Sequence, residues 1–150
     1  MIKLLPSHRV KKLTGINYDT LGWAIDKVIT ENLNKHFNFT IAVHKSRIEG
    51  TSFVWLDNRR VNFTIHLDCM DVNRRYIMSS IIHEIRHILQ HSFFKKHSFQ
   101  AFSTYKEYYN SPEEKDARNF EKLTTSVAKI YDALEGSKNV WKKHDLGTPL

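Results

Sequence analysis

The sequence predicts an α+β domain in which three main helices pack on a small antiparallel sheet of about three strands. Three observations lead to this prediction: helical spacing of apolar residues from residue 19 to about 37, strand-like alternation between residues 39 and 67, and two further helical patterns at 71–90 and 111–136. The chain has 150 residues, of which 41% are hydrophobic, and this suffices for one core. We therefore expect a single domain over residues 1–150, with an N-terminal extension at 1–17 and a C-terminal tail at 137–150.

The first helical pattern places its apolar residues along one face. They recur at intervals of three and four residues, at Leu21, Ala24, Ile25, Val28, Ile29 and Leu33. Such spacing is typical of a helix that buries one side against a core.

Three strands are predicted after this helix, at residues 39–43, 51–56 and 61–67. The first two are rich in β-branched and aromatic residues. In the third, Val61, Phe63, Ile65 and Leu67 alternate with polar residues, which is typical of a strand with one buried face. Asp57 and Asn58 suit a tight turn between the second strand and the third.

Two more helices are predicted in the second half of the chain. Asp71 is the expected N-cap of the first, whose buried face carries Ile77, Ile81, Ile85, Ile88 and Leu89. The run SPEE at 111–114 combines an N-cap serine, a proline at the first helical position and a glutamate at the third, so it marks the start of the second. This long helix is expected to end near Gly136.

The overall charge bears on compartment and partners. A net charge of +7 and a pI near 9.5 are compatible with an anionic partner such as nucleic acid, but the basic residues come in small groups. One cysteine, Cys69, excludes an internal disulfide, and no apolar run has the length of a secretory signal core or of a membrane span. We expect a cytoplasmic protein without membrane contact; the sequence does not predict its oligomeric state.

The run HEIRHILQ at 83–90 carries the chemistry. His83 and His87 are four residues apart, so on a helix both imidazoles project from nearly the same side and reach one metal ion. Two imidazoles, one further protein ligand and an open position for water form the arrangement of catalytic zinc sites. Glu84 follows His83 directly, which places its carboxylate beside that water as a general base.

Two segments resemble the zincin metallopeptidases, and more narrowly the gluzincins. They are HEIRH at 83–87 and EKDARNF at 114–120, and the second is similar to the E-x-x-A pattern of small ImmA/IrrE-type peptidases and related phage and bacterial zincins. The resemblance implies a zincin-like fold with the metal site on its central helix, Zn²⁺ bound by His83, His87 and Glu114, and a protein or peptide substrate. It also implies hydrolysis of a peptide bond with Glu84 as the base.

The third ligand has rivals. Glu114 also fits a capping box with Ser111, which alone would explain it. Glu113 projects nearer the centre of the apolar stripe and stays a candidate, and His97 would fold back as a loop histidine does in SprT-like proteases. His91 is rotated away from the shared ion. A metzincin would need glycine at 90 and histidine at 93, where this chain has Gln90 and Phe93, so that subclass is excluded.

Two further features of the sequence concern the substrate. One of Tyr105, Tyr108 and Tyr109 could place a hydroxyl near the developing oxyanion. The strand that holds His66 precedes the metal helix, and by analogy with zincins it would pair with an extended peptide.

Two alternatives to a peptidase stay open at this stage. One is a non-catalytic zincin-like module with a regulatory or interaction role. The other is a basic protein that binds nucleic acid and in which HEIRH is a coincidence. A SprT-like protease that acts on proteins held on nucleic acid would be a variant of the peptidase.

Overall fold

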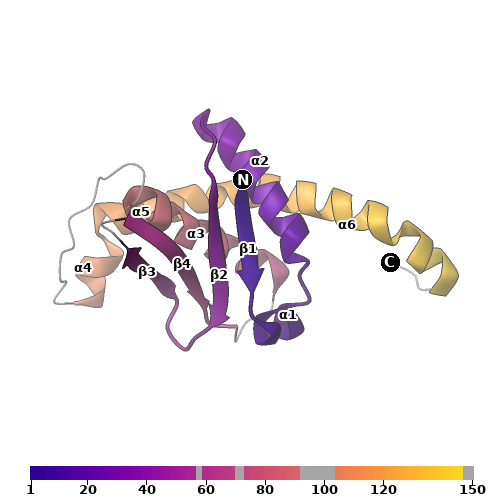
Figure 1. Cartoon of the computed structure of the whole chain (residues 1–150), viewed down its shortest axis with the longest axis horizontal. Helices are drawn as coiled ribbons and strands as arrows, with labels where there is room; N and C mark the ends of the chain where they lie inside the picture. Colours follow the sequence, from indigo (N-terminus) through magenta and orange to yellow (C-terminus); the bar gives the residue numbers. More distant parts are fainter. Residues whose placement is uncertain (57–58, 70–72, 92–103, 147–150) are drawn as a thin grey trace.

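The computed structural model describes residues 1–56, 59–69, 73–91 and 104–146. Within these residues, four strands form one mixed sheet in the order β1-β2-β4-β3 (Figure 1). The strands are β1 (Ile2–Pro6), β2 (Phe39–Lys45), β3 (Gly50–Leu56) and β4 (Arg59–Leu67). β1 runs parallel to β2 and β2 runs parallel to β4, whereas β3 and β4 form an antiparallel hairpin.

The α+β class is confirmed, but the prediction of a three-stranded antiparallel sheet is wrong. Residues 2–6, which we assigned to an extension, form β1 at one edge of the sheet. Its alternation of buried Ile2 and Leu4 with exposed Lys3 and Leu5 is too short to stand out in the sequence. β4 then inserts between β2 and β3, so β2 has two parallel neighbours and no hairpin partner. Periodicity reveals strands but carries no information on which strands become neighbours.

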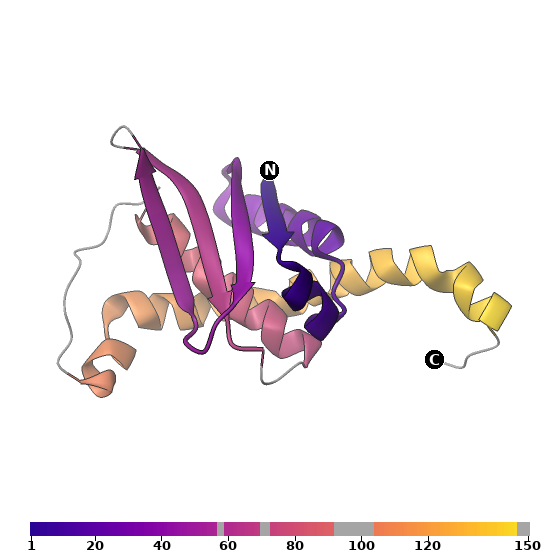
Figure 2. The same cartoon turned by 60° about the horizontal axis from the view of Figure 1, so that its bottom comes forward.

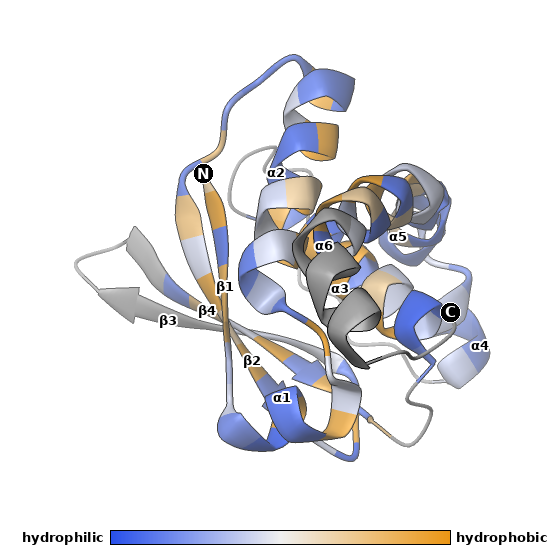
Figure 3. Ribbon diagram, turned by 90° about the vertical axis from the view of Figure 1, so that its right-hand side faces the viewer, coloured by the Kyte–Doolittle hydropathy of each residue, from blue (hydrophilic) through white to orange (hydrophobic). Residues whose placement is uncertain are grey.

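One face of the sheet is covered by helices. Figure 3 shows α2 (Tyr18–Leu33), α3 (Arg74–Leu89) and α6 (Thr124–Leu146) on the same side of it. Ile41, Val43 and Ile65 are buried on this covered face, whereas Thr40 and His44 point to the other side and are exposed. The domain is therefore a two-layer structure with its core between sheet and helices.

Helix α2 lies unusually close to β1. A Cβ added at Gly22 of α2 would stand 3.2 Å from the carbonyl oxygen of Ile2, which is tighter than ordinary van der Waals contact. The backbone N–H of Ile2 also donates a hydrogen bond to Asp26 of the same helix. Glycine is thus required at position 22 because the two backbones approach each other there.

The last predicted helix is divided in the structure. Its residues form α5 (Pro112–Phe120), a 3₁₀ turn η2 (Glu121–Leu123) and α6, which continues through Gly136 to Leu146 and extends beyond the sheet (Figure 2). The predicted stop at Gly136 is wrong, because a glycine without a left-handed conformation only weakens a helix. The 3₁₀ turn at Glu121 brings this residue towards α3.

Two smaller differences concern the approach to the site. The N-cap of α3 is Asn73, whose side chain accepts hydrogen bonds from the backbone of Arg75 and Tyr76, and Asp71 lies outside the described residues. A short helix that was not predicted, α4 (Tyr105–Tyr109), precedes α5. Along the described part of the chain, no helix combines the length and apolar character needed to cross a bilayer.

Candidate metal centre

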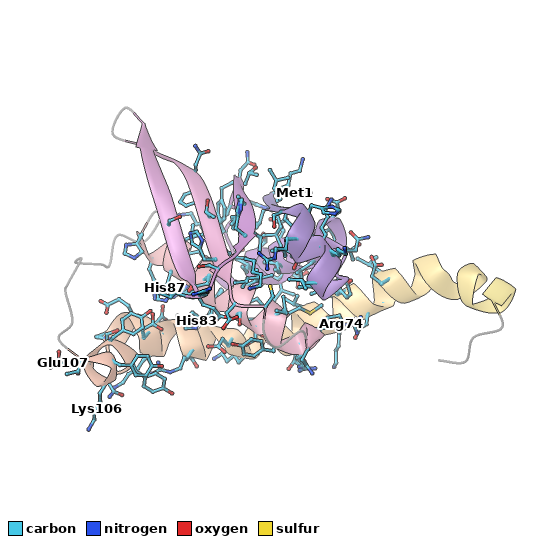
Figure 4. The ribbon with its side chains drawn as sticks, turned by 90° about the horizontal axis from the view of Figure 1, so that it is seen from below. Met1, Arg74, His83, His87, Lys106 and Glu107 are labelled. Atoms are coloured by element: carbon cyan, nitrogen blue, oxygen red, sulfur yellow. The ribbon has the colours of Figure 1, made fainter. Side chains whose placement is uncertain are left out.

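Helix α3 holds the two histidines at the edge of its buried face. Ile81, Ile85 and Ile88 are fully buried in the core. The side chains of His83 and His87 are 18% and 13% exposed to solvent. Figure 4 shows the two imidazoles next to each other, and their ring centroids are 5.0 Å apart. The helical periodicity therefore produces the shared orientation that the four-residue spacing predicted.

Glu114 of α5 meets both histidines. One carboxylate oxygen lies 3.0 Å from Nε2 of His83 and the other lies 2.8 Å from Nε2 of His87. The two Nε2 atoms are themselves 3.3 Å apart. Three side chains from two helices thus direct atoms that can bind a metal ion to one point.

The capping role of Glu114 does not compete with this geometry. The Oγ atom of Ser111 accepts a hydrogen bond from the backbone N–H of Glu114 at 3.3 Å, which is the first half of a capping box. The N–H of Ser111 donates to the carbonyl of Tyr108 and not to the Glu114 carboxylate. The backbone of Glu114 therefore closes the cap while its side chain turns to the histidines.

Glu84 follows His83 on α3 and is buried. One carboxylate oxygen of Glu84, one ring nitrogen of His83 and one ring nitrogen of His87 all lie within 4.8 Å of one another. The hydroxyl of Thr51 on β3 donates to the Glu84 carboxylate at 3.2 Å, which holds the side chain in place. Burial raises the pKa of Glu84, although the two histidines act in the opposite direction.

A second layer of hydrogen bonds orients the imidazoles. Nδ1 of His83 lies 2.8 Å from Glu121 of η2, which also accepts from the hydroxyl of Ser79 at 2.9 Å. Nδ1 of His87 lies 2.8 Å from the side-chain oxygen of Gln90. When each Nδ1 carries the proton and donates it to its outer partner, each Nε2 keeps a lone pair that can bind a metal ion at the centre.

Sequence reasoning missed these two outer residues. Glu121 lies seven residues, or about two helical turns, after Glu114, so the two share a face, and this spacing was an available signal. Gln90 is three residues after His87 on the metal helix. Its amide nitrogen donates to the carbonyl of Glu113 and to Asp116 of α5, so it ties the two helices together.

The carboxylates make the centre attractive to cations. Burial alone would lower the pKa of His83, but hydrogen bonds to Glu114 and Glu121 outweigh it and raise this pKa to about 9. The pKa of His87 is raised for the same reason by Glu114. The histidines hold the pKa of Glu114 well below its usual range. Without a metal ion, the centre binds protons instead.

The rival ligands lie elsewhere or outside the described residues. Glu113 is half-buried, and it contacts Gln90 through its backbone carbonyl. His97 falls in 92–103 and so lies outside the described part of the chain. His91 follows the end of α3, and His66 on β4 hydrogen-bonds to Ser52 at 2.9 Å.

A cavity of about 520 Å³ opens in front of the centre. Its walls come from α3, α4, α5, η2 and the segment before β3, and its lining residues are Ile48, Glu49, Tyr76, Ser80, His83, Glu84, Tyr105, Tyr108, Tyr109, Glu114, Arg118 and Glu121. All three tyrosines singled out in the sequence line it, and Tyr108 is the one whose hydroxyl hydrogen-bonds to Glu114. The volume of this cavity is large enough for part of a peptide chain.

Comparisons with protein-family models, curated proteins and solved structures found no significant match to this chain. The geometry of the centre is therefore the basis for the function proposed below.

Proposed function

We propose that this protein is a zinc-dependent peptidase of the zincin type. The observation that carries the proposal is the convergence of the Nε2 atoms of His83 and His87 on the two oxygens of the Glu114 carboxylate, at 3.0 and 2.8 Å. Two imidazoles from one helix and a carboxylate from another form the ligand set of an open catalytic zinc site.

The donor set favours zinc among the common metal ions. Imidazole nitrogens suit zinc, whereas magnesium and calcium prefer sites made of oxygen atoms alone. Both histidines have their Nδ1 atoms engaged by outer groups, Glu121 and Gln90, which is the usual support of a ligating imidazole. The Glu84 carboxylate lies within 4.8 Å of a ring nitrogen of each histidine, close enough to act beside the metal, and we assign it to the reaction and not to the metal.

The residues around the centre fit the hydrolysis of an amide. When bound, zinc polarises the scissile carbonyl and lowers the pKa of a water molecule. Glu84 takes a proton from the attacking water and transfers it to the leaving nitrogen as the C–N bond breaks. Burial raises the pKa of Glu84, and a carboxylate with a higher pKa is a stronger base.

Tyr108 is the best candidate for stabilising the oxyanion. Burial and the neighbouring Glu114 raise the pKa of its hydroxyl, so the group keeps its proton and stays a donor. A hydrogen bond to the developing negative charge is worth more in the transition state than in the ground state.

Strand β3 is the better place for an extended substrate than the strand that holds His66. His66 belongs to β4, which lies between β2 and β3 and has no free edge. β3 is the edge strand on this side of the sheet, and its Thr51 contacts Glu84. A peptide added to β3 would therefore pass beside the proposed base.

The test is zinc content per chain together with cleavage. We expect one zinc per chain in the purified protein, loss of zinc in His83→Ala, weaker binding in Glu114→Gln and full retention in Glu84→Gln. A proteome-derived peptide library digested with the zinc-loaded protein and read by mass spectrometry should show new termini that are missing with Glu84→Gln. Absence of zinc after reconstitution would refute the proposal.

A further inference from the structure

One wall of the cavity carries a single arginine. Arg118 lies in the last turn of α5, is half-buried, and places its guanidinium 3.7 Å from the centre of the Tyr109 ring. Among the residues that line the cavity it is the one lysine or arginine side chain. Stacking on an aromatic face holds a guanidinium in a defined plane and leaves its N–H edge available.

The acidic residues of the cavity are engaged with other partners. Glu84 accepts from Thr51, Glu49 accepts from Tyr76, and Glu121 accepts from Ser79. Glu114 binds both histidines. Within the part of the chain that the structure describes, no carboxylate forms an ion pair with Arg118.

Other arginines of the protein show that such pairing is available in this fold. Arg86 contacts Asp116 at 2.7 Å, and Arg74 contacts Asp132 at 2.8 Å. A half-buried cation without a carboxylate has lost part of its hydration and has not regained it through an ion pair. Arg118 is therefore ready to bind an anion from outside the chain.

The position of Arg118 relates it to the metal centre. It follows Glu114 by four residues on α5, so both project from one side of the helix and are offset by about 6 Å along its axis. Alternate side chains of an extended peptide are about 7 Å apart. A peptide whose scissile carbonyl lies at the histidines thus brings a nearby side chain, or its own terminus, towards Arg118.

We propose that Arg118 binds a carboxylate of the substrate and so makes the peptidase select peptides with an acidic group close to the scissile bond. The planar guanidinium offers two parallel N–H donors, which match the two oxygens of a carboxylate. This inference rests on the proposed peptidase function and adds its substrate class. The carboxylate belongs either to an acidic side chain or to the C-terminus of the substrate.

A purely structural role for Arg118 makes a different prediction. A cation in the last turn of a helix stabilises that helix through its dipole, and this effect does not depend on any ligand. Loss of the arginine would then lower thermal stability and leave the relative affinities of charged and neutral ligands unchanged.

The test compares three hydroxamate probes on one dipeptide scaffold, each of which anchors to zinc. The first carries Asp and an amidated C-terminus, the second carries Asn and a free C-terminus, and the third carries Asn and an amidated C-terminus. Calorimetric titration measures their affinities for the zinc-loaded protein and for Arg118→Gln. Lys115→Gln is the matched control, because Lys115 is an exposed cation on the same helix that does not line the cavity.

We expect one of the two probes with a carboxylate to bind about tenfold more tightly than the probe without one. This preference should be the same for the unmodified protein and for Lys115→Gln. Arg118→Gln should abolish this preference without loss of zinc, and Arg118→Lys, which keeps the charge but not the planar pair of donors, should retain part of it. The probe that is preferred identifies a side-chain or a terminal carboxylate as the recognised group.

Two results would overturn the inference. Equal affinities of the three probes for the zinc-loaded protein, or a preference that survives in Arg118→Gln, would remove the role of Arg118 and leave the zinc peptidase intact. Elemental analysis of the same samples separates the other failure: a protein without zinc refutes the proposed function, and the inference falls with it.

Discussion

The pH dependence of the metal-free protein follows from the environment of His83. Burial would lower the pKa of this imidazole, but its hydrogen bonds to Glu114 and Glu121 raise the pKa from 6.5 to about 9. In the unfolded chain the pKa returns to about 6.5. The folded state therefore binds the proton more tightly than the unfolded state does.

The sign and size of the effect can be worked out directly. Because the folded pKa is the higher one, the stabilisation is complete below about pH 6.5 and is lost as the pH rises through about 9. A difference of about 2.5 pKa units at about 1.4 kcal/mol each amounts to roughly 3 kcal/mol. The His83 side chain is only 18% exposed, so solvent screening removes little of this energy. The fall in the pKa of Glu114 comes from His87 and Tyr108 as well as from His83, and it is not added to this energy because the attraction to His83 is already included.

Urea denaturation in the presence of a chelator, at steps from pH 6 to pH 9.5, measures this loss. We expect the free energy of unfolding to fall across the window, and to fall less in His83→Gln, which keeps the other titrating groups. Zinc affinity should change in the opposite direction, rising about tenfold per pH unit for each proton that zinc displaces. A free energy of unfolding that stays constant or rises with pH would refute the electrostatic reasoning.

Three further predictions address the outer hydrogen bonds, the proposed oxyanion donor and the helix packing. Glu121→Gln should weaken zinc binding by about 10- to 100-fold in a competition titration with a fluorescent chelator; unchanged affinity would contradict its orienting role. Tyr108→Phe should lower kcat by about a hundredfold on a cleaved peptide and leave KM nearly the same, whereas an equal rise in KM would point to substrate binding. Gly22→Ala should destabilise the fold by about 1–3 kcal/mol in denaturant unfolding because its Cβ meets the carbonyl of Ile2, while the control Gly136→Ala, with nothing within 4 Å, should stabilise it by up to about 1 kcal/mol.

Local sequence patterns were sufficient for most of the individual elements. The spacing of Leu21 to Leu33 predicted α2, the alternation from Val61 to Leu67 predicted β4, and SPEE predicted the start of α5. These patterns succeed because helical and strand periodicities depend on residues a few positions apart. β1, α1 (His8–Thr14) and α4 were missed because they are only 5 to 7 residues long.

The arrangement of the sheet could not be read in the same way. Its mixed order depends on β1 pairing with β2 across two intervening helices and on β4 entering between β2 and β3. Such pairings are selected by the total burial of the core, to which every element contributes, and not by any one strand. For this reason the proposed substrate strand is β3, an edge strand, and not the internal β4.

For the candidate site, the sequence by itself determined the arrangement of side chains that belong to the same helix. The spacing of His83, Glu84 and His87 sets which side chains share a face, because helix geometry relates residues four apart directly. Only the tertiary structure decided which carboxylates reach the imidazoles. Glu114 and Glu121 come from a second helix and the 3₁₀ turn after it, and their distances of 2.8–3.0 Å to the histidines exist because α5 packs against α3. Contacts between elements depend on the packing of the whole core, so spacing along the chain indicates which carboxylates share a face but not which of them reach the histidines.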